Sequence, residues 1–194
     1  MLKNTRIITG SKVVLRDKKL ADAVDDYVWR TDHKLAQLDA TTPLTMTFPE
    51  YLSSYASELH HPSLGRHSLA IETLDGKHIG NCMYYEVNEA KNEAELGILI
   101  GNRDYWDKGY GTDAVATLLS HIFHQSNLKR IYLKTLDWNN RAQKCFGKCR
   151  FTTHGHMVSD GYSFVLMEIH RRQWEEQQTD NLVRSMRTKD TNPN

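Results

Sequence analysis

The chain has few of the features that would place it outside the ordinary globular classes. Its 194 residues include only three cysteines and four prolines, and its mean hydropathy is −0.61. Three thiols cannot all pair, which argues against a disulfide scaffold and for a reducing compartment. No apolar run approaches the ~20 residues that cross a bilayer, and residues 1–10 contain no apolar signal core. We therefore expect a cytoplasmic protein with no membrane partner.

An excess of charge of one sign is also missing. The 25 Lys and Arg residues nearly balance the 24 Asp and Glu residues, for a net charge of +1. This balance excludes a broadly electrostatic nucleic-acid binder. The length favours one domain, which we expect over residues 1–174. The strongly polar segment over residues 175–194 predicts a poorly ordered tail.

Hydrophobic periodicity predicts a mixed α/β (α+β) fold. Leu96, Ile98 and Ile100 alternate with Glu95, Gly97 and Leu99, as in a strand with two different faces. The Asp75-Gly76 pair predicts a tight turn between two earlier strands, and Thr47 and Glu50 form a capping-box pattern at a helix start. Alternation predicts strands over 12–16, 68–73, 79–86, 94–101, 130–136, 151–157 and 162–170. Helical spacing predicts helices over 20–29, 47–59, 113–125 and 141–148, whereas residues 31–46 show little periodicity and predict a long loop. The order predicts a mixed, mostly antiparallel central sheet flanked by helices, with one crossover.

A glycine loop opens the longest amphipathic helix. Residues 108–113 read KGYGTD, and glycines there let the backbone approach a ligand closely. Backbone N–H groups at a helix N-terminus bind phosphate. The plain alternative is a tight loop whose glycines serve chain geometry alone. A dinucleotide site is a second alternative, because residues 109–114 fit G-x-G-x-x-G/A and Asp137 follows the next strand. Residues 102–106 separate the strand from the glycines, which argues against it.

Three segments in the chain resemble the GNAT superfamily of N-acetyltransferases, and within it the RimJ/RimL-type branch. Residues 95–101 (ELGILIG) resemble the family's central strand, and residues 104–114 (DYWDKGYGTDA) are similar to its acyl-CoA loop, [QR]-x-x-G-x-[GA]. Residues 139–151 (NNRAQKCFGKCRF) resemble N-x-R-A-x-x-x-Y-E-K-x-G-F. The likeness covers about residues 12–174 and includes departures from the pattern. Trp106 occupies the position where the family pattern has Gln or Arg. Likewise, Phe146 replaces Tyr, Gly147 replaces Glu and Arg150 replaces Gly.

The resemblance implies an enzyme that transfers an acetyl group from acetyl-CoA to a primary amine by direct attack in a ternary complex. It implies a splayed sheet centre where the cofactor arm pairs with residues 98–100 and one backbone N–H serves the oxyanion. It assigns cofactor contacts to Ile98, Leu99, Ile100, Trp106, Asp107, Lys108, Gly109, Tyr110, Gly111, Thr112, Asn139 and Phe146. A homodimer is compatible with it. The acceptor is a small molecule or a protein N-terminus.

Glu95 is the candidate general base, since the resemblance places its face of the strand at the acceptor side of the cleft. A solvated glutamate that serves only solubility is the alternative. Asn139 suits a helix N-cap as well as a cofactor contact, and Phe146 lacks the hydroxyl that often protonates the leaving thiolate. Cys145 and Cys149 share a helix face as small apolar residues would.

The histidine spacing lacks a zinc pattern, so we expect no metal. The functional alternatives are an acyl-CoA-binding regulatory module without catalysis and a nucleotide-dependent oxidoreductase.

Overall fold

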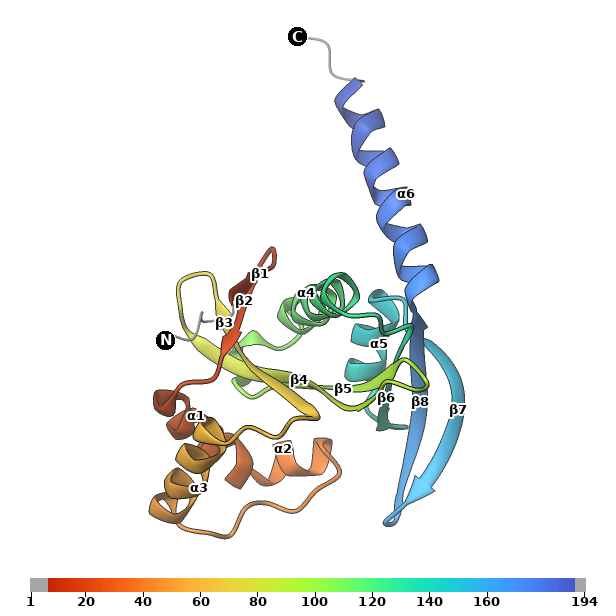
Figure 1. Ribbon diagram of the computed structural model, residues 1–194. Helices are drawn as coiled ribbons and strands as arrows, with labels where there is room; N and C mark the ends of the chain where they lie inside the picture. Colours follow the sequence, from red (N-terminus) through yellow and green to blue (C-terminus); the bar gives the residue numbers. More distant parts are fainter. Residues whose placement is uncertain (1–6, 191–194) are drawn as a thin grey trace.

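The computed structural model describes residues 7–190, with side chains to residue 180 (Figure 1). Its strands form one sheet in the order β1-β2-β3-β4-β5-β6-β8-β7. The strands are β1 (Ile7–Thr9), β2 (Val13–Asp17), β3 (Arg66–Thr73), β4 (His78–Asn88), β5 (Glu93–Ile100), β6 (Arg130–Leu136), β7 (Thr152–Ser159) and β8 (Tyr162–His170). The helices are α1 (Ala23–Thr31), α2 (His33–Leu38), α3 (Phe48–His60), α4 (Tyr110–Gln125), α5 (Asn140–Lys148) and α6 (Arg171–Asp190), with short 3-10 turns η1 (Leu20–Asp22) and η2 (Arg103–Tyr105).

The centre of the sheet is the feature that creates the site. Among the described strands, β5 and β6 form the one parallel pair, and every other neighbouring pair is antiparallel. The β5–β6 pairing spans only three partners, from Glu93 with Arg130 to Glu95 with Tyr132. Beyond Glu95 the two strands diverge. This arrangement confirms the predicted mixed, mostly antiparallel sheet, and it does not fit the doubly wound sheet that a dinucleotide site requires.

Helices cover both faces of the sheet. In Figure 1, α4 and α5 lie above β4 and β5, and α1, α2 and α3 lie below them. The apolar face of α4 packs on the sheet through Val115, Leu118 and Ile122, each at most 1% exposed. Full burial of one such side chain stabilises the fold by about 1.5–3 kcal/mol. The alternation in β5 sends Leu96 into this core and leaves Glu95 on the opposite face.

Local signals account for most element boundaries. The predicted capping box of α3 is confirmed, since the Thr47 backbone N–H donates to Glu50 Oε2 at 2.8 Å. The predicted long loop over 31–46 is wrong in part, because it contains α2. Asp32 Oδ1 accepts from the Leu35 N–H at 2.9 Å and caps this helix. Six residues are too few for a recognisable helical period. The short strand β1 was also not predicted.

The polar C-terminal segment begins within the last helix. Helix α6 continues from Arg171 to Asp190 and projects away from the sheet in Figure 1. Trp174 anchors its first turn against Phe123, with ring centroids 5.3 Å apart. The polar segment expected from residue 175 is therefore helical to residue 190, and residues 191–194 lie outside the described residues.

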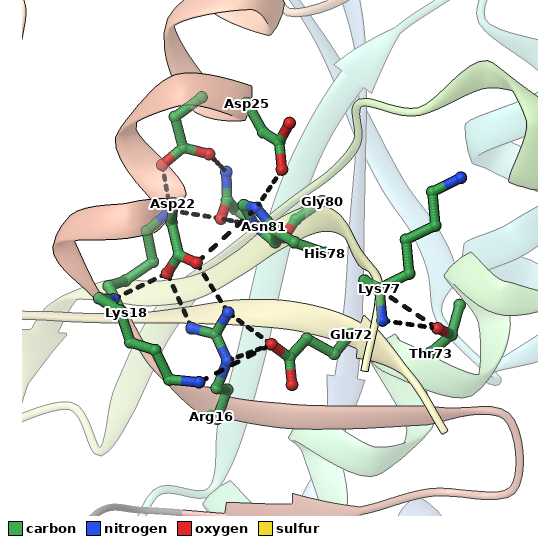
Figure 2. Close-up of polar contacts among 12 residues, drawn as sticks. Arg16, Lys18, Asp22, Asp25, Glu72, Thr73, Lys77, His78, Gly80 and Asn81 are labelled. Carbon is green, nitrogen blue, oxygen red and sulfur yellow. Dashed lines mark hydrogen bonds and ion pairs between the residues drawn. The ribbon is translucent and has the colours of Figure 1, made fainter. Parts of the chain in front are cut away.

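A buried polar network joins the start of α1 to β2, β3 and β4 (Figure 2). The Arg16 guanidinium donates to both carboxylate oxygens of Asp22 at 2.7 Å and to Glu72 at 2.6 Å. In the same network, His78 Nε2 contacts the Gly80 carbonyl at 2.9 Å and His78 Nδ1 lies 3.2 Å from Asp25. Because α1 packs on α2 and α3, this network holds all three helices against the sheet.

Candidate acetyl-transfer site

A cavity of about 580 Å³ opens where β5 and β6 diverge. Its walls come from β5, β6, the glycine loop, α5, the end of α2 and the β7–β8 turn. Every residue that the sequence predicted for cofactor or catalysis lines it, except Lys108 and Tyr110. The lining members are Glu95, Ile98, Leu99, Ile100, Trp106, Asp107, Gly109, Gly111, Thr112, Asn139 and Phe146.

The glycine loop ends as the N-terminus of α4. Gly109 is the N-cap with φ of +86°, a left-handed conformation that favours glycine. Gly111 faces the cavity, and a Cβ there would meet Cys145 Sγ at 3.5 Å. The Tyr110 ring instead packs on Tyr105, with centroids 4.9 Å apart, below the Lys12 ammonium. The loop therefore presents backbone at Gly109–Thr112, rather than the Tyr110 side chain, to the cavity.

Asp113 links the N-terminus of α4 to the β1–β2 turn and the start of β2. Its carboxylate accepts backbone hydrogen bonds from Ser11, Lys12 and Val13 at 2.7–3.1 Å. Lys12 Nζ also donates to the Lys108 carbonyl at 3.1 Å. A carboxylate in the first turn of a helix complements the helix dipole. These contacts hold the loop rigid against the β1–β2 turn.

Trp106 closes the end of β5 with its indole. Its Nε1–H donates to the Ile100 carbonyl at 2.7 Å, so one backbone acceptor of the predicted cofactor-pairing segment already has a partner. The guanidinium carbon of Arg141 lies 3.3 Å from the centroid of the Trp106 ring. This cation–π stack links the loop before α4 to the first turn of α5. The departure from Gln or Arg at position 106 thus has a structural role.

Glu95 lies at the point where β5 and β6 part. Its side chain is buried, with 6% of the residue exposed. The Tyr85 hydroxyl donates to Glu95 Oε1 at 2.7 Å, and Lys134 Nζ lies 4.0 Å from the same oxygen. Burial, followed by the hydrogen bond to Glu95, raises the pKa of Tyr85, so the phenol stays protonated. The alternative of a solvated Glu95 does not fit this environment.

Helix α5 and its N-cap carry Asn139, Phe146 and two cysteines, and the contacts of each residue indicate its role. Asn139 Oδ1 accepts from the Ala142 N–H at 3.2 Å and caps the helix, while Asn139 also lines the cavity. Phe146 is buried and packs edge-on to Phe151, with centroids 5.8 Å apart. Burial raises the pKa of Cys145, and raises that of Cys149 to about 12. These thiols are therefore protonated packing groups.

Charge is divided between the two ends of the cavity. The end beside the glycine loop is lined by Arg141, Lys144 and Lys148 of α5, with Asp107 as the acidic neighbour. The other end holds Glu95 and Lys134 next to Tyr85, with the charge of Asp39 close enough to act on the Tyr85 hydroxyl, and Asp160 of the β7–β8 turn also lines the cavity. One end suits a polyanion and the other suits a cation.

Sequence reasoning missed Tyr85, Lys134 and Asp39 as site residues. The pairing register places Tyr85 directly opposite Glu95. The register shifts between Tyr85 and Asn88, so counting strand residues back from the β4–β5 turn does not predict this pair. Lys134 sits on the predicted strand β6, where only the divergence from β5 exposes it to the cavity. Asp39 follows the helix that was not predicted.

Neither a metal-binding cluster nor a membrane-spanning helix is present in the described part of the chain. No three His, Cys, Asp or Glu side chains between residues 7 and 180 are arranged to hold a metal ion. No helix in the described chain has the length and apolar character to cross a membrane.

Comparisons with known proteins agree with this geometry. Residues 12–152 match the family model described as acetyltransferase (GNAT) domain. The uncharacterised N-acetyltransferase p20 of Bacillus licheniformis is 30% identical over 90 residues, which are 46% of this chain and 49% of that protein. The chain thus matches about half the length of this curated relative.

Solved structures share the fold at lower identity. A spermidine N-acetyltransferase from Vibrio cholerae, solved with CoA and spermine, has 21% identity and a TM-score of 0.75, over 84% of this chain and 98% of that one. An aminoglycoside acetyltransferase solved with coenzyme A has 21% identity and a TM-score of 0.71, over 86% and 99%. Because the family model covers most of the chain, this protein belongs to the GNAT acetyltransferase family.

Proposed function

We propose that this protein transfers the acetyl group of acetyl-CoA to a primary amine by direct attack in a ternary complex. The observation that carries the proposal is the position of buried Glu95 at the vertex of the β5–β6 divergence, in the same cavity as the N-terminus of α4. Orientation of two reactants in one cavity supplies much of the rate in such a reaction.

The residues present fit the cofactor. Backbone N–H groups at the start of α4 suit the pyrophosphate, since Gly109 and Gly111 keep this surface free of side chains. The backbone of Ile98 and Leu99 lies beyond the last β5–β6 pair and is available to the pantetheine arm. Phe146 packs beside that arm, and Asn139 keeps its amide N–H for it. When bound, acetyl-CoA supplies the thioester carbonyl that the amine attacks.

Glu95 has the role of general base. An amine reacts through its lone pair, so the ammonium form must first lose a proton, directly or through water, to the Glu95 carboxylate. The hydrogen bond from Tyr85 orients this carboxylate, and Lys134 Nζ lies 4.0 Å from its Oε1. A general base contributes roughly 100- to 10,000-fold to the rate.

The acceptor in this proposal is a cationic amine. The two carboxylates of Asp39 and Glu95 lie around Tyr85 in the cavity, with one lysine, Lys134, beside Glu95. Substrates of the RimJ/RimL-type branch include such amines, and one neighbour in fold was solved with spermine. We also propose a cytoplasmic location, because Cys82, Cys145 and Cys149 are all free thiols, as is usual in a reducing compartment. It is compatible with a homodimer.

Cofactor binding and turnover test the proposal. Acetyl-CoA should raise the melting temperature and NAD(P) should not, which separates an acetyltransferase from an oxidoreductase. Release of free thiol should then be measured with amino acids, polyamines, aminoglycosides and N-terminal peptides. Thiol release with cationic amines supports the enzyme. Binding of acetyl-CoA without turnover on any amine would favour the acyl-CoA-binding regulatory module instead.

A further inference from the structure

One face of α5 carries a row of cations along the cavity. Arg141, Lys144 and Lys148 are spaced three and four residues apart, so they share a face of the helix, and all three line the cavity. None of the three forms an ion pair with a carboxylate of the described residues, although Asp107 lines the same end. Like charges at this spacing destabilise a helix. A bound anion would remove that repulsion.

The row runs past the N-terminus of α4 and beyond it. Arg141 is fixed at one end by its stack on Trp106. Cys145 lies midway, with its Sγ 3.6 Å from Thr112 Oγ1 and close to Gly111. Lys148 lies one turn further along, and the rise of an α-helix puts it about 10 Å from Arg141. The lysines therefore extend the positive surface beyond the backbone N–H groups of the glycine loop.

Two phosphate environments follow from this arrangement. The glycine loop and stacked Arg141 suit a phosphodiester that lies against the backbone. Lys144 and Lys148 have flexible stems and compact charges, which suit a terminal phosphate monoester with charge near −2. Coenzyme A carries both groups, a pyrophosphate and a 3′-phosphate on the ribose. We propose that Lys144 and Lys148 bind the 3′-phosphate, so that this enzyme selects acetyl-CoA over its 3′-dephospho form.

This inference rests on the proposed function, because it assigns one end of the same cavity to the nucleotide. Lys144 and Lys148 are specificity-determining residues in it, and they take no part in the acetyl transfer. Charge at these positions matters more than shape. Replacement by arginine should therefore preserve the selectivity, and replacement by glutamine should remove it.

Calorimetric titration of the full chain with acetyl-CoA and with 3′-dephospho-acetyl-CoA tests the assignment. The native protein should bind acetyl-CoA about tenfold more tightly, as expected for two partly exposed charge contacts to one dianion. The K144Q/K148Q double variant should bind the two ligands within about twofold of each other, at the Kd of the native protein for the dephospho form. Higher salt should reduce the native preference.

Two controls keep the outcome specific. K144R/K148R should retain the preference. K91Q removes an exposed lysine on the β4–β5 turn, 3.9 Å from Glu93, and should bind both ligands as the native protein does. The assignment is overturned if the native protein does not discriminate, or if K144Q/K148Q weakens both ligands equally. Failure of the native protein to bind either ligand would contradict the proposed function as well.

Discussion

The Tyr85 hydroxyl donates a 2.7 Å hydrogen bond to Oε1 of Glu95, directly across the β4–β5 pairing. The bond orients one buried carboxylate at the point where β5 leaves β6. A protonated phenol cannot accept the amine proton here, because burial and Glu95 hold the Tyr85 pKa above its ordinary value. In the proposed mechanism Glu95 is therefore the proton acceptor, and Tyr85 is the residue that positions it.

Glu95→Gln should keep the shape of the side chain and remove the base. We expect kcat/KM to fall about 100-fold or more at pH 7, the range typical of a lost general base. The loss should shrink at about pH 10, where a larger share of an alkylamine is already deprotonated. The measurement is a pH profile of thiol release for both proteins. A loss that does not change with pH would remove Glu95 from proton transfer.

Tyr85→Phe should affect turnover and leave cofactor binding intact. Loss of a hydrogen bond to a charged group costs about 1.5–3 kcal/mol, so we expect kcat to fall about tenfold or more. The KM for acetyl-CoA should stay within about twofold of the native value, because Tyr85 does not belong to the predicted cofactor surface. An increase in that KM with native kcat would show that Tyr85 acts on the cofactor.

Gly111→Asp should put a negative charge on the surface assigned to the pyrophosphate. We expect acetyl-CoA affinity to fall by about 100-fold, through charge repulsion and obstruction. Gly111→Ala is the matched control, since its Cβ would make only ordinary contacts of 3.5 Å with Cys145 and 3.6 Å with Ile100. Calorimetry on both folded variants measures the effect. Native affinity in Gly111→Asp would take the loop out of the cofactor site.

Two substitutions at Phe146 distinguish a role in packing from a need for acid catalysis. Phe146→Tyr should leave kcat within about tenfold, because the pKa of the coenzyme A thiol is low enough for departure without an acid. Phe146→Ala should weaken acetyl-CoA binding, since it deletes a buried ring that lines the cavity. Both kcat and the acetyl-CoA Kd should be measured. A hundredfold gain in kcat from Phe146→Tyr would show that thiolate departure limits the native protein.

Asp22→Asn should destabilise the fold by about 3 kcal/mol, because it breaks the buried pair with Arg16. Burial alone would raise the pKa of Asp22, but the bonds from Arg16 and the Lys19 backbone lower it. The stabilisation is therefore complete above the unfolded-state value of about 3.9 and is lost as pH falls through the lower folded-state value. Urea unfolding at several pH values measures it. Equal unfolding free energies for both proteins at pH 7 would contradict this role.

Local patterns predicted the elements that carry the cofactor surface. The strand over 130–136 has the predicted bounds, and α4 and α5 begin within three residues of their predicted starts at 113 and 141. The capping box at Thr47 and the glycine loop before α4 were also recognised. These features depend on neighbours in the chain, namely periodicity, caps and turn residues, so they can be derived before any tertiary contact is known.

The sequence by itself therefore determined the class of fold, the glycine loop before α4 and Glu95 as the candidate base. Only the tertiary structure decided what surrounds that base. The positive φ of Glu86, +51°, accompanies the irregularity in β4 that aligns Tyr85 with Glu95. Asp39 and Asp160 lie far apart in the sequence, yet both line the same cavity. Strand register and the approach of distant segments arise from packing of the whole sheet, and no short stretch of sequence encodes them.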